Sequence, residues 1–282
     1  MSGFFYGLNF IKSMKIQIIN IRPGGNDTSL VKGIIRDPIK RKFINDKIMK
    51  LYPNIEQVGF VNLDPENPEL LIAGGEFCAN AIVCNAFLTL GGKPGKILIK
   101  ASGVKRKLVA GVTANSEAFA EMPVNSEPKQ TIIKIKNSSD YLVKMDGIIH
   151  YVTFSDMVLK NMNQNQIKQR AMNIIKQNKL DTFPAAGVMY VRKMNKELSI
   201  IPVVYVRDIN TLFIESACGS GSTAVGMVVS LKNNSGIKDL SIYQPSGNPI
   251  KVTVNYKKGK FSYTQIQNPI KVLNDINISI DI

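Results

Sequence analysis

The chain has 282 residues, of which 44% are hydrophobic and 20% are charged, and this composition excludes wholesale disorder and a fibrous repeat. Its length allows one large domain or two medium ones. Lysine and arginine number 36 against 21 aspartate and glutamate residues, so the formal net charge is +15. Such a charge raises nucleic acid, an anionic membrane and an acidic ligand as partners, and the positions of the charges have to decide among them.

The basic residues are spread along the chain, which is typical of a solvated lysine-rich surface. The densest runs, 40–42 and 105–107, are short and belong to no known nucleic-acid-binding module, so we expect no nucleic-acid partner. The longest span with a single charge, 70–92, carries polar residues and glycines, so we expect no membrane segment. The amino end lacks a signal-peptide pattern and the three cysteines form no disulfide framework, so we expect a soluble, cytoplasmic protein.

Residues 1–13 are expected to form an extension, after which a first series of short strands surrounds one apolar helix. Alternating apolar residues predict strands, and a spacing of three to four residues predicts helices. Strands are expected at 14–21, 57–61, 69–72, 96–101, 107–112 and 118–122, and helices at 37–51 and 77–90. The second helix is apolar on most sides, which predicts that it is buried.

A second series of the same kind follows a break near residues 125–128. Strands are expected at 141–145, 148–154, 187–191, 200–206, 240–243, 250–256 and in the tail from 270, and helices at 164–178 and 218–231. The repeated order predicts two similar lobes, although the sequence contains no literal repeat. The N-terminal lobe would comprise residues 14–124, completed by the C-terminal strand at about 270–282, and the C-terminal lobe would comprise residues 125–269.

A cysteine opens each of the two apolar helices. Cys78 stands in the run E-F-C-A-N-A and Cys218 in the run E-S-A-C-G-S-G. At the start of a helix the backbone N–H groups lack partners and carry the positive end of the helix dipole, so they can bind a ligand carboxylate. The same field is expected to lower the pKa of each thiol. We therefore predict that Cys78 and Cys218 are an acid/base pair and that Cys84, inside the first helix, is an ordinary buried residue.

Two other kinds of cysteine chemistry are less consistent with the sequence. A cysteine protease needs a histidine near the nucleophile, but the only histidine, His150, lies in a predicted strand and is interpreted as structural. A thioredoxin-like redox pair needs a C-x-x-C spacing, which is missing. The cysteine spacing also fits no zinc site, so we expect no metal.

The two cysteine runs resemble those of diaminopimelate epimerase and its relatives, the cofactor-independent amino-acid racemases, and the resemblance covers nearly the whole chain. The segment 20–27, which contains Asn26, resembles the first substrate-binding loop of that family, and Glu56 and Gln57 stand where the family has an acidic residue followed by glutamine. The resemblance implies an α+β fold of two similar lobes, each a mostly antiparallel sheet or barrel wrapped around a central helix, with the active site in the cleft between them.

The resemblance also implies an isomerase that uses neither pyridoxal phosphate nor another cofactor. One cysteine, as a thiolate, would remove the α-proton of an amino acid, and the other, as a thiol, would deliver a proton to the opposite face. The residues implied to contact this small-molecule substrate, besides the catalytic Cys78 and Cys218, are Asn26, Glu56, Gln57, Ala79, Asn80, Glu215, Gly219 and Ser220. Whether the protein forms a homodimer is a question that the sequence leaves open.

The sequence departs from diaminopimelate epimerase where that enzyme holds the distal head group of its substrate. Ile148, Ile149 and Gly187 stand where the family has polar residues. These departures resemble the histidine racemase branch, so L-histidine is the expected substrate and Glu56 the expected acceptor for an imidazole N–H. Diaminopimelate epimerase stays open as an alternative, and a basic nucleic-acid-binding protein on the same fold is the alternative of another class.

Overall fold

The computed structural model describes residues 13–125, 131–154, 159, 161–194 and 197–281. The predicted extension therefore lies outside the described residues, except for Ser13, which begins β1. The elements before residue 125 are β1 (Ser13–Pro23), β2 (Thr28–Lys32), α1 (Pro38–Leu51), β3 (Gln57–Asn62), β4 (Glu69–Ile72), α2 (Ala79–Thr89), β5 (Gly95–Ala101), β6 (Leu108–Val112) and β7 (Glu117–Glu121). The later ones are β8 (Ile132–Lys134), β9 (Tyr141–Met145), β10 (Ile148–Thr153), α4 (Gln164–Gln177), β11 (Ala185–Met194), β12 (Glu197–Val206), β13 (Thr211–Ile214), α5 (Gly219–Asn233), β14 (Ile237–Tyr243), β15 (Pro249–Lys257) and β16 (Lys260–Asp281).

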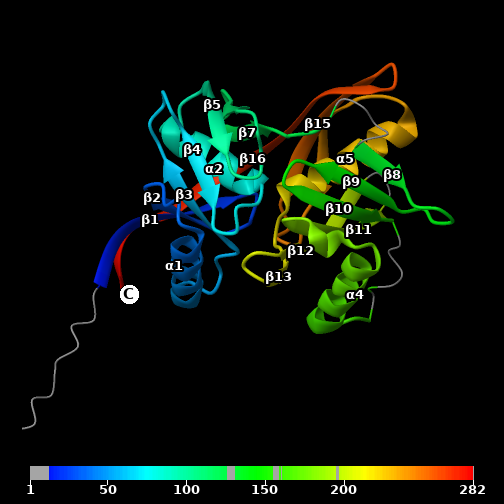
Figure 1. The fold of residues 1–282 in the computed structure, drawn as a ribbon. Helices are drawn as coiled ribbons and strands as arrows, with labels where there is room; N and C mark the ends of the chain where they lie inside the picture. The colour runs from blue at the N-terminus through cyan, green and yellow to red at the C-terminus, as the bar shows by residue number, and fades with distance from the viewer. Residues whose placement is uncertain (1–12, 126–130, 155–158, 160, 195–196, 282) are drawn as a thin grey trace, which may run out of the picture.

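Eight strands close into a barrel, in the order β1, β2, β3, β4, β5, β6, β7 and β16, because β16 pairs with both β7 and β1. The pairings β2–β3 and β4–β5 are parallel and the others are antiparallel. Helix α2 contacts strands on all sides of this barrel (Figure 1). Its residues from Ala79 to Ala86 are all buried, which is why the sequence is apolar around the whole helix.

The remaining strands continue the sheet in the order β16, β15, β14, β12, β11, β10, β9 and β8, with β13 added beside β12. Helix α5 packs against one face of these strands and α4 against β11, β12 and β13 (Figure 1). The alternation of parallel and antiparallel pairs from β9 to β16 repeats that from β1 to β7. No pairing of β9 with β16 is found in the described part of the chain, so only the first set of strands is closed.

The prediction of a mostly antiparallel barrel around a central apolar helix is confirmed by these strands. The division into lobes of residues 14–124 with 270–282 and 125–269 stays a prediction, since β16 belongs to both sets of strands and one hydrophobic cluster contains residues of both α2 and α5. The sequence analysis missed three short strands, β2, β8 and β13. Within the described residues, no helix is long and apolar enough to cross a membrane.

Candidate active site

The starts of α2 and α5 are built alike. Cys78 and Cys218 are the N-cap residues of these helices, with extended backbone at φ −133°, ψ 108° and φ −129°, ψ 107°. Both thiols are free. The N–H groups of the following residues therefore point out of each helix beside a sulfur atom, as the sequence predicted.

The two helix starts contact each other. A Cβ atom on Gly219 would lie 2.9 Å from Ala79 Cβ and 3.1 Å from Asn80 Oδ1, so a side chain there would force the helices apart. The Asn80 side chain also donates a hydrogen bond of 2.8 Å to the carbonyl oxygen of Ala217. Small residues at these positions let segments 140 residues apart form one site.

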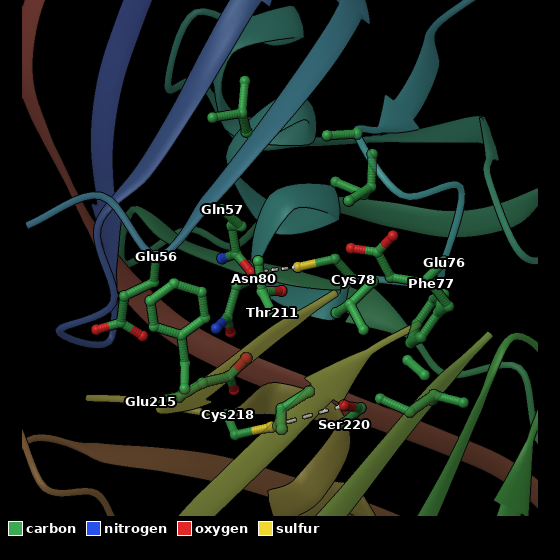
Figure 2. A pocket seen from close by; sticks show the side chains of 18 of the residues that line it. Glu56, Gln57, Glu76, Phe77, Cys78, Asn80, Thr211, Glu215, Cys218 and Ser220 are labelled. Carbon is green, nitrogen blue, oxygen red and sulfur yellow. Dashed lines mark hydrogen bonds between the residues drawn. The ribbon is translucent and has the colours of Figure 1, made fainter. Parts of the chain in front are cut away.

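One pocket is lined by both cysteines, and it encloses about 640 Å³, including the part that is open to solvent. Figure 2 shows Cys78 above and Cys218 below, with Glu56 and Glu215 on one side of them and Glu76 and Phe77 on the other. The predicted site residues that line this pocket are Glu56, Gln57, Cys78, Ala79, Asn80, Glu215, Cys218, Gly219 and Ser220.

Asn26 is the predicted site residue that does not line the pocket. It is fully buried behind the wall and hydrogen-bonds both Glu56 and Gln57. Of the residues singled out for the distal end of the substrate, only Ile148 lines the pocket. Ile149 belongs to the hydrophobic cluster that contains α4 residues, because alternate side chains of a strand face opposite sides of the sheet.

Cys78 lies at the end of a chain of hydrogen bonds that starts at Glu56. Asn26 Nδ2 donates to Glu56 Oε2 at 2.5 Å. Gln57 Nε2 donates to Asn26 Oδ1 and, at 2.7 Å, to Thr28 Oγ1, and the Cys78 thiol donates to Gln57 Oε1 at 2.9 Å. A carboxylate only accepts, so Glu56 determines which way each amide points. The orientation that results favours the protonated thiol of Cys78.

Cys218 has different partners. The N–H of Gly221 donates to its sulfur at 3.4 Å, and the hydroxyl of Ser220 lies 3.7 Å from it. Its thiol also hydrogen-bonds the carboxylate of Glu215. The partner of Cys218 is therefore an acid, whereas that of Cys78 is a neutral amide.

The prediction that both thiols have a lowered pKa is wrong for this structure. Burial raises the pKa of Cys78, and the nearby carboxylates of Glu215 and Glu76 raise it further. Burial and the neighbouring Glu215 likewise raise the pKa of the Cys218 thiol. The helix N–H groups lower both values, but removal of a thiolate from water outweighs them. The sequence could not show how completely the thiols are enclosed.

Three glutamates share this pocket, and burial raises the pKa of each. The pKa of Glu76 rises to about 7 and that of Glu215 to about 8, the latter also because Glu56 and Glu76 are close. Burial raises the pKa of Glu56 as well, while hydrogen bonds from Ser216 and Asn26 oppose the rise. No lysine, arginine or histidine is found among the described residues that line the pocket. The pocket therefore favours a ligand that brings positive charge.

Glu56 joins the barrel to the strands beyond it. Its carboxylate accepts from the N–H of Ser216 at 3.1 Å and from the Ser216 hydroxyl, in addition to Asn26. The Ser216 hydroxyl oxygen also lies 2.9 Å from the carbonyl oxygen of Gly25, so its single proton serves one of these two acceptors at a time. Sequence reasoning missed Ser216, although it lies only two residues before Cys218. Its partner is 160 residues away, so no local pattern indicated it.

His150 and Cys84 are placed as predicted. His150 is fully buried in β10, does not line the pocket, and burial lowers its pKa to about 3. Cys84 is fully buried within α2. Sequence reasoning missed Thr211 and Phe213 of β13 and did not include Glu76 among the site residues, yet all three line the pocket. The signal that could have identified Glu76 is its position, two residues before Cys78 in the first cysteine run.

A family model described as "Histidine racemase CntK N-terminal domain" matches residues 15–275 of this chain. The chain belongs to this family. It is 29% identical over 250 residues to a histidine racemase from Fusobacterium nucleatum subsp. nucleatum, covering 84% of this chain and 88% of that protein. It is 23% identical over 245 residues to a histidine racemase from Staphylococcus aureus, covering 82% and 86%. The predicted family resemblance and the predicted isomerase class are thereby confirmed.

Solved structures share the fold at low sequence identity. A hydroxyproline epimerase from Agrobacterium vitis with bound trans-4-hydroxy-L-proline has a TM-score of 0.61 at 11% identity, covering 95% of this chain and 93% of that one. A PhzF-family phenazine biosynthesis protein from Bacillus anthracis has a TM-score of 0.62 at 11% identity, covering 94% and 99%. At this identity the likeness concerns the fold alone.

Proposed function

We propose that this protein is an amino-acid racemase that needs no pyridoxal phosphate and interconverts L- and D-histidine with a pair of cysteines. The observation that carries the proposal is the pair of N-cap cysteines, Cys78 and Cys218, on two helix starts that meet in one pocket. The names of its relatives and family support the choice of histidine.

The substrate carboxylate would lie on the N–H groups that follow each cysteine, at Ala79, Asn80, Gly219 and Ser220. Helix N-termini bind anions, and their dipoles stabilise the negative charge that develops on the substrate when the α-proton leaves. The α-ammonium group would pair with Glu215, whose pKa of about 8 falls when a cation binds beside it. In this pose the α-carbon faces both sulfur atoms.

The proton that leaves Cys218 to solvent before the reaction is regained from solvent at Cys78 after it, so the proton transfers balance. With the α-ammonium group bound beside Glu215, the pKa of the Cys218 thiol falls and its proton leaves to solvent, and the resulting thiolate removes the α-proton to form a carbanion. The Cys78 thiol then donates its proton to the opposite face, which inverts the centre and leaves a thiolate at Cys78. Reaction of the other enantiomer runs the same steps backwards. Asn26 and Gln57 hold Cys78 in place, and Glu56 holds the segment that carries Cys218.

In the proposed enzyme, residues 14–124 with 270–282 form one lobe and residues 125–269 form the other. The two lobes enclose the substrate and exclude water. Diaminopimelate fits the pocket poorly because its distal carboxylate would find Glu56, Glu76 and Glu215 but no cationic side chain among the described lining residues. The cytoplasmic location and the absence of nucleic-acid and membrane partners stay predictions, as does the question of a homodimer.

A panel of L-amino acids incubated in D₂O tests this function. The enzyme should introduce deuterium at the α-carbon of L-histidine, without added cofactor, far faster than at that of diaminopimelate. Chiral chromatography should show D-histidine appearing with the same time course. Faster exchange of diaminopimelate would contradict the substrate, and exchange of no amino acid would contradict the function.

A further inference from the structure

Glu76 is a buried carboxylate with an unused oxygen. Its side chain lines the pocket, and the residue is only 6% exposed. Its Oε2 atom is buried and has no hydrogen-bond partner. Leaving such an acceptor unpaired costs about 1–3 kcal/mol, so a site of this kind is normally completed by a donor.

The chain makes room for this carboxylate, and against the effect of burial the nearby charge of Arg41 lowers its pKa without a hydrogen bond to it. A Cβ atom on Gly74 would lie 2.5 Å from Glu76 Oε2, so the glycine provides the space that the oxygen occupies. Arg41, the nearby arginine, donates instead to the carbonyl oxygens of Ile35 and Arg36 at 3.1 and 2.7 Å. The Ser102 hydroxyl fixes the backbone by donating to the Glu76 carbonyl oxygen at 2.8 Å. The geometry holds the carboxylate in place for a donor from the pocket.

The other two glutamates of the pocket already have partners. Glu56 accepts from the N–H and hydroxyl of Ser216 and from Asn26, so most of its acceptor positions are occupied. Glu215 lies beside the thiol of Cys218 and is assigned to the α-ammonium group in the proposed function. Figure 2 places both of them across the cysteines from Glu76. With the α-ammonium at Glu215, Glu76 therefore lies at the other end of the pocket, on the side open to the substrate side chain.

The wall beside Glu76 suits a flat, largely apolar ring. Phe77, Ile148 and Val206 line the same pocket. A Cβ atom on Gly74 would also lie 2.8 Å from Val206 Cγ1, which places this apolar side chain beside the carboxylate. An imidazole offers apolar faces and one or two N–H donors at its edge.

We propose that Glu76 is the specificity-determining residue that accepts the side-chain N–H of the substrate, a role that the sequence had led us to expect of Glu56. This inference rests on the proposed function, since it names the group that recognises the side chain. The pKa of Glu76, about 7, lies close to that of an imidazole, so one proton shared between them satisfies both groups.

The test compares L-histidine with L-β-(2-thienyl)alanine, which has a five-membered ring of similar size but no N–H. Deuterium exchange at the α-carbon is measured for the wild type, Glu76→Gln, Glu76→Leu and Glu56→Gln, with the exposed Glu66→Gln as the control. Glu76→Gln keeps the shape and one acceptor oxygen, so a loss of folding in Glu76→Leu would not end the test.

The wild type should have a kcat/KM about 10- to 100-fold higher for histidine than for thienylalanine, which is the effect of one hydrogen bond to a charged group. Glu76→Leu should reduce this preference to within about threefold. The loss should appear mainly as a higher KM for histidine, because the bond from Glu76 to the ring is the same before and during proton transfer. Glu76→Gln should lie between the two, and Glu66→Gln should match the wild type. Thienylalanine should react equally with the wild type and Glu66→Gln, and in the other variants the ratio of the two substrates carries the test, with Glu56→Gln expected to keep the histidine preference.

Three results would overturn the inference. The first is a wild type with the same kcat/KM for both substrates. The second is a histidine preference that stays unchanged in both Glu76 variants. The third is a preference that is lost in Glu56→Gln but kept in the Glu76 variants. The proposed function would survive each of them, because histidine is still racemised. Exchange of neither substrate by the wild type would instead contradict the proposed function itself.

Discussion

The two helix starts share a backbone but differ in the side chains that surround each sulfur. Both cysteines are N-caps with nearly identical φ and ψ angles, one on the helix inside the closed barrel and one on the helix of the open set of strands. Cys78 donates to the amide of Gln57, whereas Cys218 contacts the acid Glu215. Two helix starts of the same backbone geometry thus present one thiol each, and the neighbouring side chains of the two thiols differ.

This difference has a direction. The hydrogen-bond chain from Glu56 presents a neutral amide oxygen to Cys78, whereas the carboxylate of Glu215 raises the pKa of Cys218. A substrate α-ammonium group that pairs with Glu215 is therefore expected to lower the pKa of Cys218 and make it the base, with Cys78 as the acid. The following predictions test whether the chemistry follows this asymmetry.

The largest effect is expected when either thiol is removed. Cys78→Ala and Cys218→Ala should each lower the racemisation rate by at least about a thousandfold, because each removes the proton carrier on one face. Cys84→Ala is the matched control and should keep most activity. Chiral chromatography of histidine measures all three, and near-wild-type racemisation by Cys218→Ala would disprove the two-base mechanism.

Glu215→Gln should lower kcat by about a hundredfold, since a neutral amide does not hold the α-ammonium group that lowers the pKa of Cys218 during the reaction. Without substrate, alkylation of Cys218 by iodoacetamide should instead become faster, because the carboxylate that raises the pKa of this thiol is gone. The exposed Glu197→Gln serves as the control. Unchanged kcat in Glu215→Gln would show that the two cysteines do not differ in the way proposed.

The raised pKa values of Glu76 and Glu215 make the stability depend on pH. An unfolded glutamate titrates near 4.5, but these groups titrate at about 7 and about 8 when folded, so the folded state binds their protons more tightly. Their contribution is complete below about pH 4.5 and is lost as the pH rises to about 8. Urea unfolding should show that Glu76→Gln gains about 1–3 kcal/mol over the wild type between pH 5 and pH 8. A constant difference between the two proteins would contradict the raised pKa.

The smallest effect is expected at Gln57, which orients Cys78 but exchanges no proton. Gln57→Met should lower kcat about five- to tenfold, the value of one neutral hydrogen bond, and should leave the alkylation rate of Cys218 unchanged. The exposed Gln177→Met is the control. A loss as large as that of Glu215→Gln would mean that both cysteines depend equally on their partners.

Local sequence determined the elements that carry the site. The apolar runs predicted α2 and α5 to within two residues at their starts, because a helix buried on all sides must be apolar on all sides and because small residues and a cysteine mark where each begins. Helix α1 begins at Pro38 after the Asp37 cap, within one residue of the prediction. Motifs of this kind are readable because their cause lies within one turn of the chain.

Only the tertiary structure decided how these elements act on one another. Closure of the barrel by β1 and β16, the contact between the helix starts and the bond from Glu56 to Ser216 all join residues far apart in the chain. The sequence predicted lowered thiol pKa values because it showed the helix dipoles but not the burial that outweighs them. It likewise could not show which glutamate keeps a free oxygen. Desolvation and hydrogen-bond pairing depend on everything that surrounds a group in space, and no local pattern in the chain contains that information.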